Sequence, residues 1–144
     1  MEDRNGELRA LCDWRKEYIL QQATESANRY LNQKTLSPLD GTFTVVKDHI
    51  SVKGMTARFG LSFNNKVEEV DTVVIERLKS SGIIIVGISH MTQLGMSVFG
   101  ANPSPLHGTC RNPVNPNFYP GASSSGTAGT QIHYNLTIFQ PSHY

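Results

Sequence analysis

One apolar run, IIIVGIS at residues 83–89, constrains the fold more than any other stretch of this chain. Its apolar residues do not alternate with polar ones, so the run predicts a strand that is buried on both faces. The β-branched run TFTVVKD at residues 42–48 predicts a second buried strand. Between them, residues 71–81 have a helical pattern, with Asp71 as the expected N-cap and Gly82 as the expected stop. This order of strand, helix and strand predicts a parallel pair in an α/β sheet.

The segments that flank this unit predict two more helices and a long loop. Residues 7–32 repeat apolar positions at a spacing of three to four, which predicts one N-terminal helix. Residues 90–100 predict a short third helix. The stretch that follows is rich in proline and asparagine, and long irregular segments of this kind are either functional or disordered.

Composition limits the class of partner. The chain has 144 residues, a net charge of +1 and scattered basic residues, so it lacks the basic field that nucleic-acid partners require. Its longest apolar run is too short to span a membrane, and its N-terminus has no signal-peptide pattern. The histidines show no metal-ligand spacing, which predicts no metal and no cofactor. The two cysteines form no disulfide framework and fit a reducing, cytoplasmic compartment.

Lys47 stands at the carboxyl end of the first predicted strand, where open parallel sheets bind their ligands. The pKa of a lysine is about 10.4, and desolvation lowers it towards neutrality, so that the amine becomes a base. The alternative is a surface lysine that pairs with the neighbouring Asp48. The residues alone leave both interpretations open.

A second candidate is PGASSSGTAG at residues 120–129. Gly/Ser/Ala segments are typical of flexible linkers. Small residues also allow the backbone to approach a ligand closely and to adopt strained geometry. A linker and a reactive serine segment are therefore both consistent with this composition.

Taken in order, three segments resemble the amidase signature family: LDGTFTVVKDHISVKGM, DTVVIERLKSSGIIIVGISHMTQLGMSVFGANPSPLHGTCRNP and PGASSSGTAG. The resemblance implies an amidase-signature fold and hydrolysis of a small amide or ester by a Ser–cis-Ser–Lys triad. It implies that Lys47 is the catalytic lysine and that Ser123, preceded by a cis peptide bond, is the bridging serine. Neutral Lys47 would deprotonate Ser123, which would deprotonate a nucleophilic serine to give an acyl-enzyme. Ser124 and Ser125 would line the substrate pocket.

The sequence also departs from the family pattern. His90 and Gln93 stand where the family usually has asparagine and glutamate, which alters the expected substrate contacts. The family's nucleophile lies about two dozen residues beyond the bridging serine, in a D-x-G-G-S segment that also supplies the oxyanion hole. Counting on from Ser123 passes Tyr144, and TQIHYNLTIFQPSHY shows no counterpart of the helix that follows the bridging serine in the family.

We therefore expect a truncated α/β amidase-signature fold, with a parallel or mixed sheet and flanking helices. The expected divisions are an N-terminal helix and connection at 1–38, a partial amidase-signature domain at 39–129 and an unrelated tail at 130–144. The favoured hypothesis is an inactive chain in which Lys47 stays exposed and protonated. One alternative is a binding or regulatory module that occupies the site of a full-length homologue. The other is an active hydrolase that uses a serine of the 123–125 run directly as nucleophile.

Overall fold

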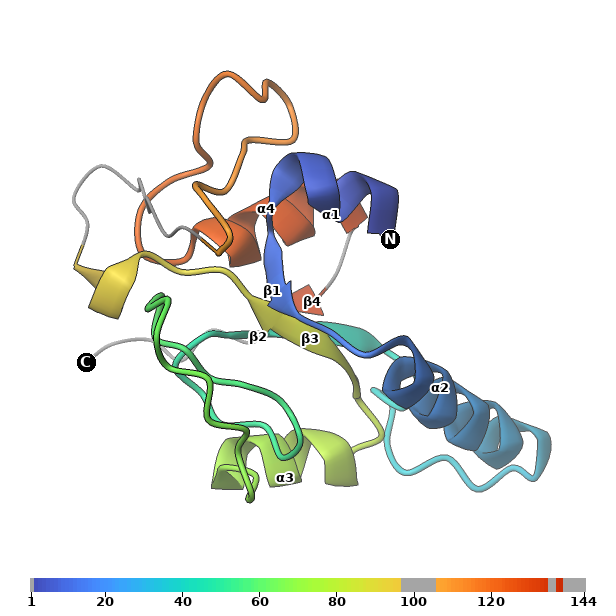
Figure 1. The fold of residues 1–144 in the computed structure, drawn as a ribbon. Helices are drawn as coiled ribbons and strands as arrows, with labels where there is room; N and C mark the ends of the chain where they lie inside the picture. The colour runs from blue at the N-terminus through green and yellow to red at the C-terminus, as the bar shows by residue number, and fades with distance from the viewer. Residues whose placement is uncertain (1, 97–105, 135–136, 139–144) are drawn as a thin grey trace.

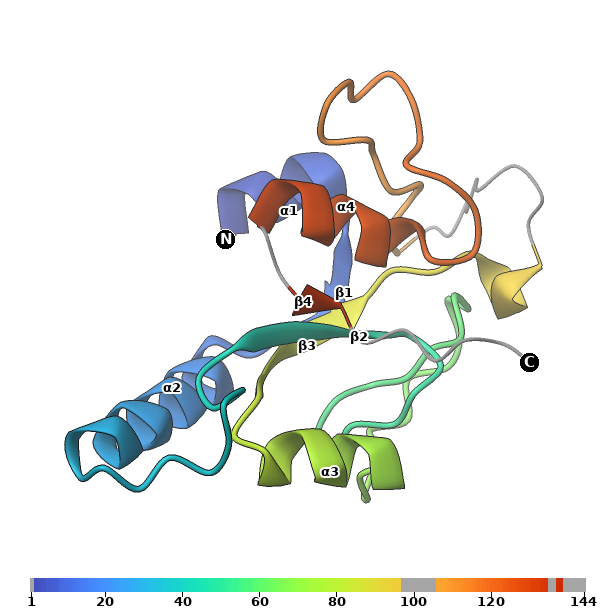
Figure 2. The same cartoon turned by 180° about the vertical axis from the view of Figure 1, so that it is seen from behind.

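A mixed sheet flanked by helices organises the chain in this computed structural model, which describes residues 2–96, 106–134 and 137–138. Across these residues the sheet has four strands in the order β1-β3-β2-β4. The strands are β1 (Leu11–Asp13), β2 (Phe43–Lys47), β3 (Ile84–Ser89) and β4 (Thr137–Ile138). The helical elements are α1 (Glu2–Leu8), α2 (Lys16–Leu31), α3 (Val73–Ser80), the 3-10 turn η1 (Gln93–Gly95) and α4 (Ser125–Tyr134). Figures 1 and 2 show α1 and α4 on one face of the sheet and α3 on the other.

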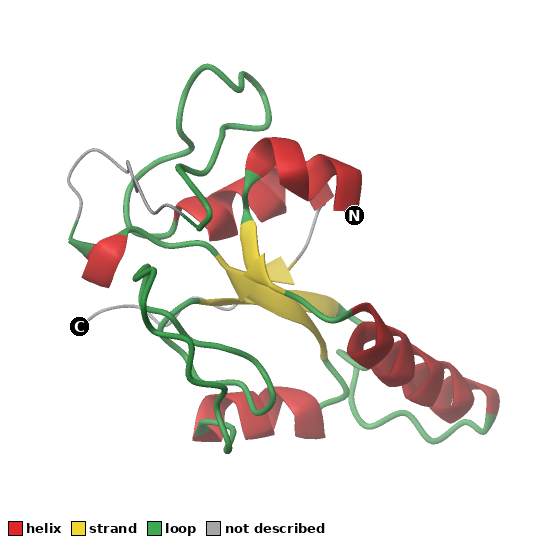
Figure 3. Ribbon diagram, in the orientation of Figure 1, coloured by secondary structure: helices red, strands yellow, loops and turns green. Residues whose placement is uncertain are grey.

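The central pair of strands confirms the predicted unit. β2 and β3 are parallel neighbours, and α3 connects them. All six residues of β3 are buried, because helices cover both faces of the sheet (Figure 3). One cluster, on the α3 face, includes Val46, Ile75, Ile85 and Ile88, and another, on the opposite face, includes Leu11, Val45 and Val86. β1 runs antiparallel to β3, so the sheet is mixed.

Helix α3 ends at the predicted glycine but does not start as predicted. Gly82 adopts a φ of +83 and donates its N–H to the Lys79 carbonyl over 2.9 Å, which closes the last turn. The predicted N-cap role of Asp71 is wrong: Thr72 occupies that position and makes no side-chain cap. Asp71 instead accepts a hydrogen bond from Lys79 Nζ over 2.7 Å. Its carboxylate is therefore engaged in an ion pair and does not cap the N-terminus of α3.

The prediction of one helix over residues 7–32 is wrong, because a strand interrupts it. The buried Asn5 side chain ends α1: its Oδ1 accepts the backbone N–H groups of Ala10, at 3.0 Å, and Leu11, at 2.8 Å. Leu11 then pairs with Ser89 of β3. Pairing and burial against a strand far along the chain outweigh the local helical pattern.

The two helical expectations near the C-terminal half also need correction. In the predicted helix at 90–100, the described part holds only the single turn η1, and residues 97–100 lie outside the described residues. The expectation that no helix follows Ser123 is wrong, since α4 begins at Ser125 and packs on β2 and β3. Its first residues are small, which lets the helix approach the sheet closely.

Candidate active site

Lys47 and Ser123 meet at the carboxyl ends of the two parallel strands. Lys47 is the last residue of β2 and pairs in register with Ser89, the last residue of β3. Ser123 reaches the same edge from the loop that leads into α4. The Lys47 Nζ donates a hydrogen bond to the Ser123 Oγ over 2.7 Å. The fold therefore brings together two residues that lie far apart in the sequence.

Lys47 is buried, with a relative exposure of 3%. Burial lowers the pKa of Lys47 below its ordinary value of 10.5, because desolvation penalises the charged ammonium. The expectation that Lys47 stays exposed with an unshifted pKa is therefore wrong. The alternative of a surface lysine paired with Asp48 is also wrong. The Asp48 carboxylate accepts the backbone N–H groups of Arg58 and Gly60, over 2.6 and 2.7 Å.

The peptide bond before Ser123 is trans, as is every peptide bond among the described residues, so the expected cis bond is absent. A cis bond that does not precede proline costs about 3–4 kcal/mol and persists only where the surroundings enforce it. Here Gly121 and Ala122 are exposed, and an added Cβ at Gly121 would meet no atom within 4 Å.

The three serines of the run have different environments. Ser123 lines a cavity of about 270 Å³ together with Lys47. Ser124 is half-buried and its carbonyl accepts the N–H of Ala128 in the first turn of α4. Ser125 is fully buried, and its Oγ lies 3.4 Å from Nδ1 of His90. A role for Ser124 and Ser125 in substrate binding stays a prediction.

His49 and Gly95 also line this cavity, and its other lining residues are apolar: Phe59, Met91 and Leu94. Sequence reasoning did not single them out. Phe59 and Leu94 both adopt left-handed backbone conformations, with φ of +58 and +49, and the Leu94 N–H donates to the Phe59 carbonyl over 2.8 Å. Such conformations cost of order 1–3 kcal/mol each and gather at functional sites. The only signal in the sequence is that each of the two residues precedes a glycine.

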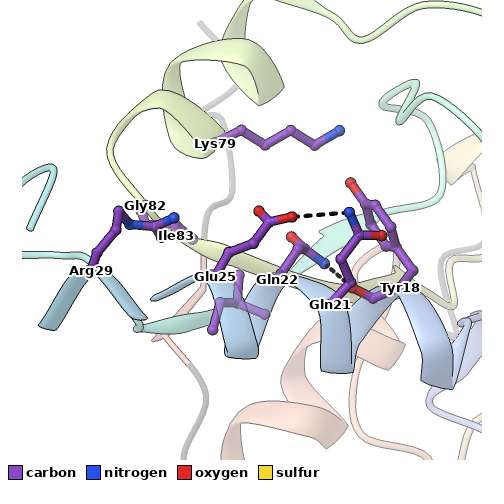
Figure 4. Close-up of a pocket in the computed structure, with 9 residues that line it drawn as sticks. Tyr18, Gln21, Gln22, Glu25, Arg29, Lys79, Gly82 and Ile83 are labelled. Carbon is purple, nitrogen blue, oxygen red and sulfur yellow. Dashed lines mark hydrogen bonds between the residues drawn. The ribbon is translucent and has the colours of Figure 1, made fainter. Parts of the chain in front are cut away.

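A second cavity, of about 170 Å³, lies between α2 and the start of β3. Figure 4 shows Arg29, Lys79 and Glu25 around it. The two cations are already paired, Arg29 with Asp40 and Lys79 with Asp71, each over 2.7 Å. Paired charges on the wall of a cavity indicate a structural role, so this second cavity is a weaker candidate for a catalytic site than the cavity at Lys47.

Ranges 2–96, 106–134 and 137–138 contain no group of three His, Cys, Asp or Glu side chains arranged to hold a metal ion. No helix within the described residues is both long enough and apolar enough to cross a membrane.

Comparisons with known proteins show similarity to amidases and to an amidotransferase subunit. Fatty acid amide hydrolase from Medicago truncatula is 38% identical over 112 residues, which are 76% of this chain and 18% of the relative. A glutamyl-tRNA(Gln) amidotransferase subunit from Endomicrobium trichonymphae is 28% identical over 129 residues, 89% of this chain and 26% of the relative. Peptide amidase from Stenotrophomonas maltophilia superposes with a TM-score of 0.77 at 26% identity, covering 90% of this chain and 27% of that one.

The chain thus spans between 18% and 27% of the length of these three relatives. The sequence pattern of the family described as Amidase matches residues 2–130, which is most of the 144 residues. The residues that match the family pattern include both Lys47 and Ser123. The chain belongs to the amidase family.

Proposed function

We propose that Lys47 and Ser123 form the proton-transfer half of a serine amidase centre that acts on small amides or esters. The observation that carries this proposal is the 2.7 Å hydrogen bond between the buried Lys47 Nζ and the Ser123 Oγ. A lysine acts as a base only when neutral, and burial favours the neutral amine. Neutral Lys47 would take the proton of the Ser123 hydroxyl, and Ser123 would take the proton of a nucleophilic hydroxyl.

The names of the relatives support the cleavage of a carbon–nitrogen bond as the reaction class, because they include an amide hydrolase and a peptide amidase. The cavity beside Lys47 is small and largely apolar, which suits a small amide or ester that has an apolar group next to the reacting carbonyl.

We further propose that the 144 residues by themselves do not turn over such substrates. The resemblance to amidases implies a nucleophile in a Gly-Gly-Ser segment, and these 144 residues contain no Gly-Gly-Ser sequence. The same glycines would donate to the oxyanion, and the loss of one such donor alone costs about 10²–10³ in rate. A proton relay that has no nucleophile to activate gives no acyl-enzyme.

The test uses the 144-residue chain with a chromogenic amide, a chromogenic ester and a fluorophosphonate probe. We expect no turnover above the buffer rate and no labelling, while a known serine hydrolase in the same assay is labelled. Ser124→Ala serves as the matched control for Ser123→Ala. Labelling that disappears in both Lys47→Ala and Ser123→Ala, but persists in Ser124→Ala, would overturn the proposal of inactivity. That result would identify Ser123 as a nucleophile in its own right.

A further inference from the structure

We propose that His90 is a positioning residue, which holds the Ser123 segment against Lys47 by tying three parts of the chain together at the end of β3. The proposal rests on the proposed roles of Lys47 and Ser123. His90 directly follows β3, so it stands at the sheet edge where these two side chains meet.

The backbone of His90 joins the N-terminal segment to α4. Its N–H donates to the Ala10 carbonyl over 2.8 Å, and its carbonyl accepts the N–H of Gly126 over 2.9 Å. A Cβ added at Gly126 would lie 2.3 Å from both the Ala10 carbonyl oxygen and the His90 nitrogen. The first turn of α4 therefore rests directly on the backbone of these two segments.

The His90 side chain makes the third connection. It is 2% exposed, and its Nδ1 lies 3.4 Å from the Ser125 Oγ in the first turn of α4. The ring also has the backbone of Gly108 as a hydrogen-bond partner and meets the ring of His107 edge-on, with centroids 6.3 Å apart. Because Ser123 stands two residues before Ser125, the position of the His90 ring determines where Ser123 lies relative to Lys47.

A neighbouring pair of hydroxyls provides a useful contrast. The Oγ of Ser89 and the Oγ1 of Thr127 lie 2.7 Å apart, and both side chains are buried. Like the contact between His90 and Ser125, this pair joins the end of β3 to the first turn of α4, but it does not involve the His90 side chain. Replacing Thr127 by valine removes the hydroxyl contact and leaves the contacts of His90 in place.

The His90 ring is neutral at pH 7. Burial lowers the pKa of His90 to about 4, and the neighbouring His107 acts in the same direction. The charged groups nearby, Arg58 and Asp13, face His107 and have opposite effects on its pKa. A neutral asparagine amide reaches about as far as Nδ1, so His90→Asn keeps a polar atom towards Ser125. His90→Gln places its amide further out, beyond the position of Nδ1.

The experiment measures the ¹⁵N shift of the Lys47 side-chain nitrogen by NMR at pH 7 in the full 144-residue chain. Ser123→Ala defines the shift of Lys47 without its partner. We expect His90→Ala and His90→Gln to move the Lys47 signal at least about half of that distance. We expect His90→Asn and Thr127→Val to leave it close to the wild-type position. Circular dichroism and the backbone amide spectrum report whether each variant folds, and His90→Gln replaces His90→Ala where the latter does not fold.

The outcomes separate this inference from the proposed function. If Ser123→Ala itself leaves the Lys47 signal unchanged, then the Lys47–Ser123 pair, and with it the proposed function, is wrong. If Ser123→Ala moves the signal but the folded His90→Ala or His90→Gln variant does not, then the positioning role of His90 alone is wrong. A shift in Thr127→Val as large as in His90→Ala would also contradict the role, because any loosening of α4 would then have the same effect.

Discussion

Replacing His90 by asparagine should make the stability of the chain fall as the pH rises from about 4 to about 6, whereas the wild type changes little over this range. In the wild type, burial lowers the pKa of His90 from 6.5 to about 4. Between these two values the unfolded chain binds a proton that the folded chain does not, so this group makes stability increase with pH. The difference corresponds to about 3 kcal/mol, at about 1.36 kcal/mol for each pKa unit.

Asp48 acts in the opposite direction over nearly the same range. Burial raises the pKa of the Asp48 carboxyl from 3.8 to about 6, although backbone N–H groups from Arg58 and Gly60 partly offset that effect. Here the folded chain keeps a proton that the unfolded chain has lost, so this group makes stability decrease as the pH rises, again by about 3 kcal/mol. The contributions of His90 and Asp48 therefore nearly cancel in the wild type. Burial also lowers the pKa of His107, which adds to the effect of His90.

Urea unfolding followed by the fluorescence of Trp14, the single tryptophan, measures these contributions at pH 4 and pH 6.5. For His90→Asn we expect a free energy of unfolding that is lower at pH 6.5 than at pH 4, by at most about 3 kcal/mol, because only His107 then opposes the contribution of Asp48. For Asp48→Asn we expect the reverse sign, since His90 and His107 then dominate. Equal pH dependence in the wild type and both variants, within about 1 kcal/mol, would refute the assignment of these two buried groups.

Two further predictions concern packing and charge. Gly126→Ala should lower the free energy of unfolding, measured in urea, by about 1–3 kcal/mol, because the added Cβ lies 2.3 Å from two backbone atoms. Gly129→Ala should be neutral or stabilising, because the nearest contact of its added Cβ is at 3.4 Å. A loss of equal size in both would contradict the close-approach argument. Lys47→Met should raise the urea midpoint, because the buried ammonium costs free energy that the thioether does not; a lower midpoint would indicate that the charge is stabilising.

The sequence was informative where the determinants of structure are local. The uninterrupted apolar run and the helix before it predicted β3, α3 and their parallel pairing with β2, since each pattern lies within a few residues. The N-terminal region was predicted wrongly because its outcome depends on β3: the helical period continues through Leu11, but that residue pairs with Ser89. Helix α4 was missed because its first residues are serine, glycine and threonine, which have little helical signal by themselves. Contacts with β2 and β3 supply what the local sequence lacks.

The candidate site was partly predictable for the same reason. Lys47 could be singled out by its position at a strand end, and Ser123 by its unusual run of neighbours. Their contact depends on α4, so the burial of Lys47 and the direction of its pKa shift could not be predicted. The apolar wall of the cavity depends on the left-handed backbone conformations of Phe59 and Leu94. The sequence indicates such conformations only through the glycine that follows each residue.

The most direct test of the central claim is the pKa of Lys47, measured by following its side-chain nitrogen by NMR from pH 6 to pH 12 in the 144-residue chain. If Lys47 acts as a base, it must lose its proton at a lower pH than an ordinary lysine does. Burial lowers the pKa of Lys47 below 10.5. We predict a midpoint below 10.5, together with a changed Lys47 signal in Ser123→Ala. A Lys47 that titrates at or above 10.5, with a signal that does not respond to Ser123→Ala, would contradict a Lys47–Ser123 proton relay.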